Sequence, residues 1–161
     1  MRLPHETDPA PIYGLDLVAG PNKVTGAFHD FSPVAGNTPL DAWFAERAAT
    51  FTPAKTRVLP DWARAIFSPS MIAANNITDP GELDAFLDLT LGNLDHYLTQ
   101  IGQRGDMDHT PQHNAYCRNQ KQNPHTPRVM ASLGFDAPVI HAFIENCLFP
   151  ELEPSTPSFR V

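Results

Sequence analysis

"PIYGLDLVAGPNKVTGAFHDFSP", residues 11–33, consists of two apolar runs on either side of the turn AGPNK. The runs over residues 12–19 and 23–31 are rich in β-branched, aromatic and leucine side chains. The glycine, proline and asparagine between them favour a tight turn. The stretch therefore predicts an antiparallel β-hairpin. One residue is out of place: Asp16 interrupts the first run where a strand usually carries an apolar or a solvated side chain.

Helical spacing of apolar residues dominates most of the remaining chain. Prolines interrupt residues 51–69, which are predicted to be mostly irregular, and residues 70–77 read as a third strand. Helices are predicted over residues 38–50, 79–102, 111–122, 126–134 and 136–149. Strands that come early, followed by helices gathered in the C-terminal half, indicate an α+β fold.

Composition limits the class of protein. The 161 residues are 42% hydrophobic with a net charge of −7, which suits one globular domain over residues 1–161 and disfavours nucleic-acid or membrane-surface binding. The two cysteines have no metal-site spacing, which is typical of reduced, partly buried thiols in a cytoplasmic protein. No apolar run reaches the length of a membrane span. Residues 152–161 are rich in proline and serine and are expected to form a flexible tail.

The residues alone leave the candidate sites open. Asp16 is either a desolvated acid beside a pocket or one polar residue on a solvated strand face. Arg57, beside a proline-constrained loop, is either a clamp for a carboxylate or a surface arginine. His109 and His113 have the spacing of a helical metal site, but the proline between them favours a solvated helix start without metal.

Three motifs in the same order resemble the ferredoxin-dependent bilin reductases. The first is the hairpin itself, with its glycine and aspartate. The second is LPDWARAIFSP at residues 59–69. The third is YCRNQKQNPHTPRV at residues 116–129, followed by GF and then LFPE. Together they extend the resemblance over roughly residues 4–151, most of the chain.

The resemblance implies a three-layer α/β/α sandwich around a central antiparallel sheet. It also implies an oxidoreductase that acts on CH–CH groups in phycobilin biosynthesis. Such an enzyme reduces a linear tetrapyrrole, biliverdin or dihydrobiliverdin, by radical steps that couple single electrons from ferredoxin, an iron–sulfur protein, to protons. No flavin, nicotinamide or metal is bound in that family. The expected partners are therefore a biliverdin-type bilin and ferredoxin.

The resemblance also implies a role for individual positions. Asp16 matches the proton donor on the central strand, and Arg57 matches a residue that binds a propionate. Asn123 matches a position where family members carry asparagine or a second aspartate that helps choose the reduced double bond. His125 stands where a lysine is usual, as a further pocket contact. Because an asparagine cannot donate such a proton, the site is predicted to depend on one acid.

The family pattern includes N-terminal strands that this sequence lacks, with a histidine and a glutamate beside the aspartate. We therefore expect an incomplete sheet. An alternative function is that of a catalytically impaired, truncated homologue that acts as a bilin-binding or interaction module. A homodimer that completes the sheet is a further expectation. Four bases are predicted to form a local basic patch for ferredoxin: Arg104, Arg118, Lys121 and Arg128.

Overall fold

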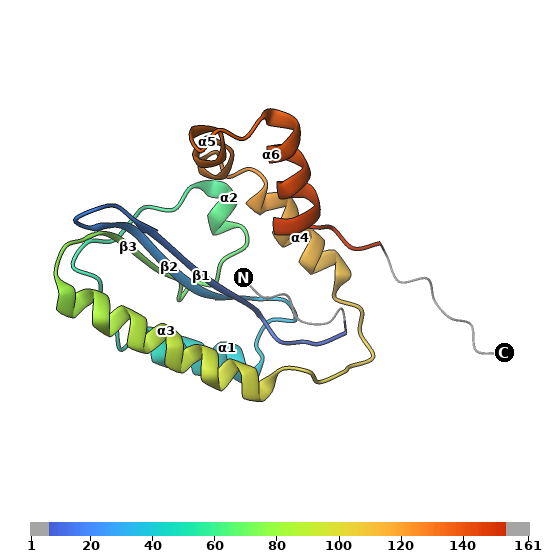
Figure 1. The fold of residues 1–161 in the computed structure, drawn as a ribbon. Helices are drawn as coiled ribbons and strands as arrows, with labels where there is room; N and C mark the ends of the chain where they lie inside the picture. Colours follow the sequence, from blue (N-terminus) through green and yellow to red (C-terminus); the bar gives the residue numbers. More distant parts are fainter. Residues whose placement is uncertain (1–6, 154–161) are drawn as a thin grey trace.

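The computed structural model describes residues 7–153 and has a three-stranded sheet with helices on either side of it (Figure 1). The strands are β1 (Ile12–Ala19), β2 (Val24–Ser32) and β3 (Ile72–Ile77), paired antiparallel in the order β1-β2-β3. The predicted hairpin and the α+β class are confirmed. Each predicted strand lies within one or two residues of its observed position.

The register of the hairpin separates its side chains into two sets. Tyr13 pairs with Phe31, and both belong to the main apolar core. Asp16 pairs with Phe28, and both line a cleft on the other side of the sheet. Because side chains alternate along a strand, the aspartate does not interrupt the core at all. We call these two sides the core face and the cleft face.

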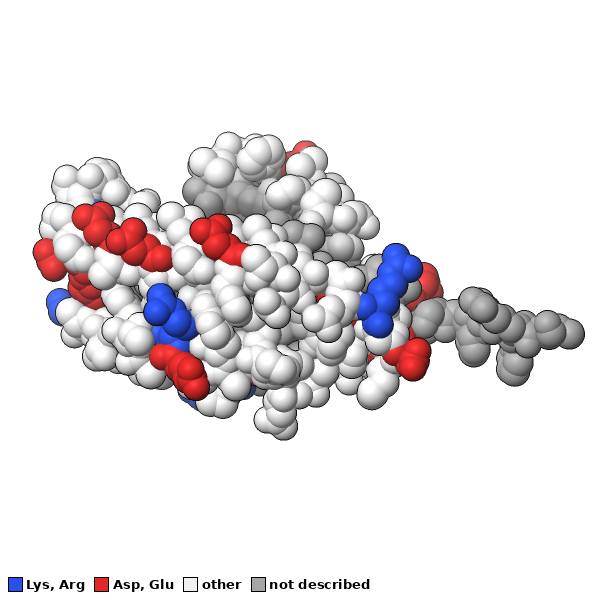
Figure 2. Space-filling view, turned by 90° about the horizontal axis from the view of Figure 1, so that it is seen from below, with Lys and Arg blue, Asp and Glu red and all other residues white. Residues whose placement is uncertain are grey.

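The core face is covered by α1 (Pro39–Ala48) and α3 (Pro80–Gln100), which lie side by side beneath the sheet (Figure 1). Both helices begin with a side-chain cap, from Thr38 and Asp79 respectively, and a proline in the first turn. The rings of Phe31 and Phe44 stack with centroids 4.5 Å apart, and Tyr97 packs edge-on against Phe31. Figure 2 looks onto the outer surface of this layer, where Asp and Glu side chains are prominent.

The cleft side carries α2 (Asp61–Arg64), α4 (Thr110–Gln120), α5 (His125–Ser132), α6 (Ala137–Phe143) and the π-helical turn η1 (Ile144–Leu148). α4 packs through a small apolar cluster of its own, around Tyr116 and Cys117. α5 buries no residue fully and α6 buries only Ile140. These helices stand at one end of the sheet (Figure 1), and a closed three-layer sandwich stays a prediction.

The segment predicted to be irregular has more order than its prolines suggest. α2 forms within it, and residues 55–57 pair with the outer edge of β3. The N–H of Arg57 donates to the carbonyl of Ala73, and the N–H of Asn75 donates to the carbonyl of Lys55. This short pairing has no alternating pattern in the sequence that would reveal it.

Other polar expectations are corrected by burial. His109 and His113 are buried rather than solvated, and no group of metal-binding side chains forms among residues 7–153.

Of the two free thiols, Cys117 is buried but Cys147 is exposed. The predicted tail begins at Leu152, which is hydrogen-bonded to Asn114, and residues 154–161 lie outside the described part. No helix within residues 7–153 is long and apolar enough to cross a membrane.

Candidate functional site

A cleft of about 630 Å³ opens above the cleft face of β1 and β2. Its floor is formed by alternate strand residues, and its walls come from α2, the end of α4, the start of α5 and the C-terminal segment. Aromatic and aliphatic side chains predominate in the walls, among them Trp62, Phe67, Val129, Leu148 and Phe149. A large, mostly apolar cavity with a few polar groups is typical of a site for a small organic ligand. The four residues to which the resemblance gives a site role, Asp16, Arg57, Asn123 and His125, all line this one cleft.

Asp16 lies on the floor of the cleft. Its side chain is reached by solvent through the open mouth, yet the surrounding walls remove part of its hydration. This desolvation raises the pKa of the Asp16 carboxyl, and a hydrogen bond from the backbone of Leu17 opposes the rise only in part. The neighbouring floor position, Gly14, has no side chain and leaves room beside the carboxyl. The arrangement suits a carboxylic acid that holds its proton to a higher pH than an ordinary aspartate and contacts a ligand lying flat on the sheet.

Arg57 reaches the floor from the segment paired with β3. Its guanidinium lies 5.5 Å from the centroid of the Phe28 ring, an arrangement that favours a cation–π contact. Gly26 makes this close approach feasible, because a Cβ there would lie 2.8 Å from the Phe28 ring and 3.3 Å from the guanidinium. Arg57 thus supplies a positive charge at the edge of an otherwise apolar wall, and this charge is suited to bind a carboxylate.

Asn123 and His125 come from the turn between α4 and α5. The backbone N–H of His125 donates to Oδ1 of Asn123 at 3.0 Å, which orients the Asn123 side chain. Its amide NH₂ is then the group suited to donate to a ligand carbonyl in the cleft. His125 is exposed at the rim. The structure therefore brings together four residues from three separate segments: Asp16, Arg57, and the neighbouring Asn123 and His125.

A family model described as ferredoxin-dependent bilin reductase matches residues 2–150. The chain belongs to this family. A phycocyanobilin:ferredoxin oxidoreductase of Gloeobacter violaceus is 33% identical over 151 residues, covering 86% of this chain and 57% of that protein. One from Prochlorococcus marinus is 34% identical over 162 residues, covering 88% of this chain and 61% of that protein.

A solved structure of PcyX matches with a TM-score of 0.53 and 30% sequence identity, covering 92% of this chain and 62% of that chain. The chain thus spans about three fifths of the length of the proteins that it matches. The family membership that the three motifs predicted is confirmed.

Asp30 is a second carboxyl that lines the cleft of this bilin reductase family member. It is 1% exposed and accepts hydrogen bonds from the hydroxyls of Ser32 and Ser68 and from the backbone N–H of Ser68. Burial raises the pKa of the Asp30 carboxyl, while these hydrogen bonds lower it. The contacts fasten the segment that carries Phe67 to β2. Asp30 therefore shapes the cleft by ordering the end of the hairpin rather than by facing a ligand.

His29 is a feature of the site region that sequence reasoning missed. It is 1% exposed, its Nδ1 donates to the carbonyl of Gly14 at 2.7 Å, and its Nε2 accepts from the amide of Asn93 at 3.0 Å. Burial lowers the pKa of His29 to about 4, so the ring is neutral near pH 7. The available signal was its place in β2, where its neighbours two residues away, Ala27 and Phe31, are both core residues.

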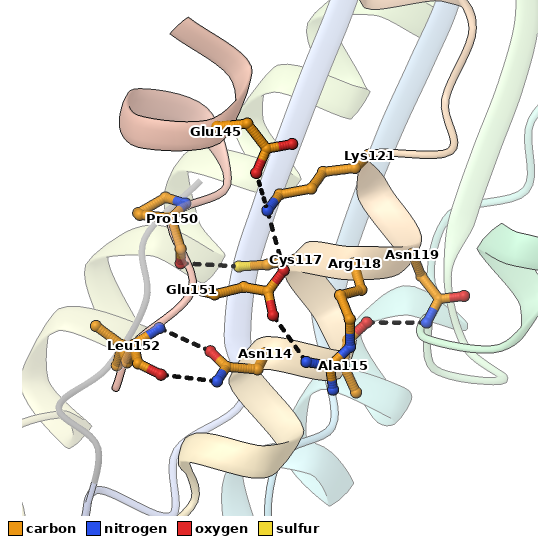
Figure 3. A network of polar contacts seen from close by, with 10 residues as sticks. All are labelled: Asn114, Ala115, Cys117, Arg118, Asn119, Lys121, Glu145, Pro150, Glu151 and Leu152. Atoms are coloured by element: carbon orange, nitrogen blue, oxygen red, sulfur yellow. Dashed lines mark hydrogen bonds and ion pairs between the residues drawn. The ribbon is translucent and has the colours of Figure 1, made fainter. Parts of the chain in front are cut away.

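The C-terminal segment is fastened to α4 by a polar network, drawn in Figure 3. Lys121 forms ion pairs with Glu145 and Glu151, and Arg118 forms a second pair with Glu151. Asn114 is hydrogen-bonded to both backbone groups of Leu152. Two of the four bases predicted as a ferredoxin patch are therefore neutralised by internal carboxylates. The ion pairs offset the positive charge of Arg118 and Lys121, because LFPE folds back onto α4, and the ferredoxin patch stays a prediction.

Proposed function

We propose that this chain carries the bilin-reducing site of a ferredoxin-dependent enzyme, with a biliverdin-type linear tetrapyrrole as its substrate. The observation that carries the proposal is the position of Asp16, an acid of raised pKa on the floor of a largely apolar cleft. The family to which the chain belongs, and the names of its relatives, support bilin and ferredoxin as partners.

The cleft offers complementary chemistry for such a pigment. A linear tetrapyrrole is flat, largely apolar and bears two propionates, lactam carbonyls and pyrrole nitrogens. The aromatic and aliphatic walls suit its rings, and the Arg57 guanidinium suits a propionate. The amide of Asn123 is suited to a lactam carbonyl. Asp16 alone on the floor is suited both to accept pyrrole N–H groups when ionised and to donate a proton when neutral.

The reaction balances as two electrons and two protons for each carbon–carbon double bond that becomes a single bond. Reduced ferredoxin supplies the electrons one at a time. After an electron reaches the bilin, the Asp16 O–H bond breaks and its proton passes to the radical anion, which leaves a carboxylate. Solvent at the cleft mouth then returns a proton to Asp16 before the second half of the reduction. No flavin, nicotinamide or metal takes part in this scheme.

An absorbance assay with biliverdin tests the proposal. Biliverdin added to the chain is expected to show a shifted spectrum on binding. Further addition of ferredoxin, its reductase and NADPH should convert the bound pigment to a reduced bilin. A shift without conversion would indicate a bilin-binding module, and a folded sample that produces no shift would contradict the proposal altogether.

A further inference from the structure

Lys121 connects two walls of the cleft that are far apart in the sequence. It is the C-cap residue of α4 and stands two positions before Asn123 in the turn that leads to α5. Its ammonium lies 2.5 Å from a carboxylate oxygen of Glu145 and 3.0 Å from one of Glu151. Figure 3 shows both carboxylates at the Lys121 ammonium. In the chain these two acids flank Leu148 and Phe149, which line the cleft. One cation is therefore shared by the wall that carries Asn123 and the wall that carries Phe149.

The environment of this contact differs from that of the neighbouring ion pair. The Lys121 side chain is 16% exposed, whereas the Arg118 side chain, one turn earlier on the same helix, is 56% exposed. Partial desolvation alone would lower the pKa of Lys121, but hydrogen bonds to Glu145 and Glu151 outweigh it and raise that pKa. The side chains of Glu145 and Glu151 are 36% and 34% exposed, so the contact is partly shielded. A partly shielded, doubly paired ammonium holds its geometry better than an exposed single pair, which contributes little.

The backbone on both sides of the Lys121 contact connects it directly to residues that line the cleft. α5 starts directly after the turn, and within the α4–α5 junction the N–H groups of Gln122 and Asn123 donate to the carbonyls of Asn119 and Gln120. η1, which carries Glu145, is a π-helical turn, a widened form that often occurs at functional sites. Lys121, at the end of α4, is the residue that reaches both Glu145 and Glu151. The C-terminal segment is otherwise held by Cys117 at Pro150, Asn114 at Leu152 and the exposed Arg118 at Glu151, and by the packing of Phe149 against the cluster around Tyr116. Releasing Lys121 would therefore loosen both walls together.

We propose that Lys121 is a positioning residue that sets the distance between the Asn123 turn and the Phe149 wall, and thereby the orientation of the bilin in the cleft. The inference rests on the proposed function for its ligand. Lys121 does not line the cleft and touches no reacting atom. It acts through Asn123, whose amide orients the pigment and so influences which double bond lies over Asp16.

The test compares Lys121→Met with Arg118→Met, which removes one positive charge from the same helix and from the same partner, Glu151. The rates of amide hydrogen exchange at residues 121–126 and at Leu152 report how readily each of the two walls opens, and they are measured without any ligand. Absorbance titration gives the dissociation constant for biliverdin. Ferredoxin-driven turnover gives the ratio of reduced bilin products. Lys121→Arg, which can bridge two carboxylates, serves as the rescue.

In Lys121→Met, exchange at both walls and the dissociation constant should each rise by about tenfold, the order expected when a shielded ion-pair network loses its centre. The product ratio should change, which a purely structural role would not cause. Arg118→Met should stay within about twofold of the parent, as for an exposed pair, and Lys121→Arg should restore the parent product ratio.

Unchanged exchange in a folded Lys121→Met sample would overturn the inference, and so would an unchanged dissociation constant and product ratio. If Lys121→Met does not fold, Glu145→Gln loosens one of the two contacts and is subject to the same criteria. A parent protein that fails to bind biliverdin would refute the proposed function instead, while the exchange comparison would still decide the positioning role.

Discussion

The two faces of the sheet differ in how they are built, although they share the same strands. The core face is closed by two long capped helices and filled by stacked rings around Phe31. The cleft face meets short helices and loops that leave a cavity over Asp16. The first arrangement depends on apolar burial and the second on a few polar contacts among distant segments. Changes to the core face should therefore alter stability, whereas changes to the cleft face should alter binding and chemistry.

The largest effect is expected from Phe31→Ala. The ring is fully buried and stacks on Phe44, so its removal leaves a cavity beneath the hairpin. The free energy of unfolding should fall by about 3–5 kcal/mol. Chemical denaturation followed by circular dichroism measures the change. A loss below about 1 kcal/mol, the level of a tolerated core exchange, would contradict the tight packing inferred for this face.

His29 provides a pH test of the core face. Its folded pKa lies near 4 against 6.5 for the free side chain, so the unfolded chain binds the proton more readily. His29 should therefore lower the free energy of unfolding as pH falls from about 6.5 to 4, by about 3 kcal/mol in total. Asp16 and Asp30 have raised pKa values, so their protonation should increase the free energy of unfolding as pH falls, which opposes the effect of His29.

The contribution of His29 is isolated by denaturation at several pH values. His29→Gln should show a shallower loss of stability between pH 6.5 and 4 than the parent. His141→Gln, at an exposed position, is the matched control and should keep the parent slope. Parallel pH profiles for His29→Gln and the parent would mean that the ring is not buried in its neutral form.

Gly26→Ala sharpens the comparison from the cleft side. The new Cβ would lie 2.8 Å from the Phe28 ring and displace the ring and the Arg57 guanidinium. Biliverdin affinity should drop by about tenfold, with a stability cost of about 1–2 kcal/mol. Gly92→Ala on α3, where nothing lies within 4 Å, should instead raise stability by up to about 1 kcal/mol and leave affinity unchanged. If Gly26→Ala and Gly92→Ala bound biliverdin with equal affinity, Arg57 would not contribute to biliverdin binding.

Sequence reasoning succeeded where local patterns carry the information. The turn between β1 and β2, the proline and cap at the start of α3, and the apolar stripe along that helix each act within a few residues. It also named Asp16 and Arg57, but only the family resemblance made them more probable as site residues than their ordinary alternatives. Alternation along β1 could not tell a cleft from open solvent.

The remaining features depend on contacts between distant segments. The bridge between Thr56 and Ala74 of β3 joins residues 18 apart, and the burial of His29 against Asn93 joins residues 64 apart. Lys121 was assigned to a basic patch and Glu151 only to the LFPE motif, because neither residue lies in a periodic pattern that shows its partner. Their ion pair arises from the fold of the C-terminal segment, which local propensities do not determine.

The central claim is that Asp16 supplies the proton, and Asp16→Asn tests it most directly. The amide keeps the size and polarity of the side chain but cannot serve as a general acid. Asp84→Asn, exposed on α3, is the matched control and should behave as the parent. We predict that Asp16→Asn binds biliverdin within about threefold of the parent, yet reduces it at least about 100-fold more slowly, the usual contribution of a general acid. Reduction by Asp16→Asn at the parent rate would contradict the account.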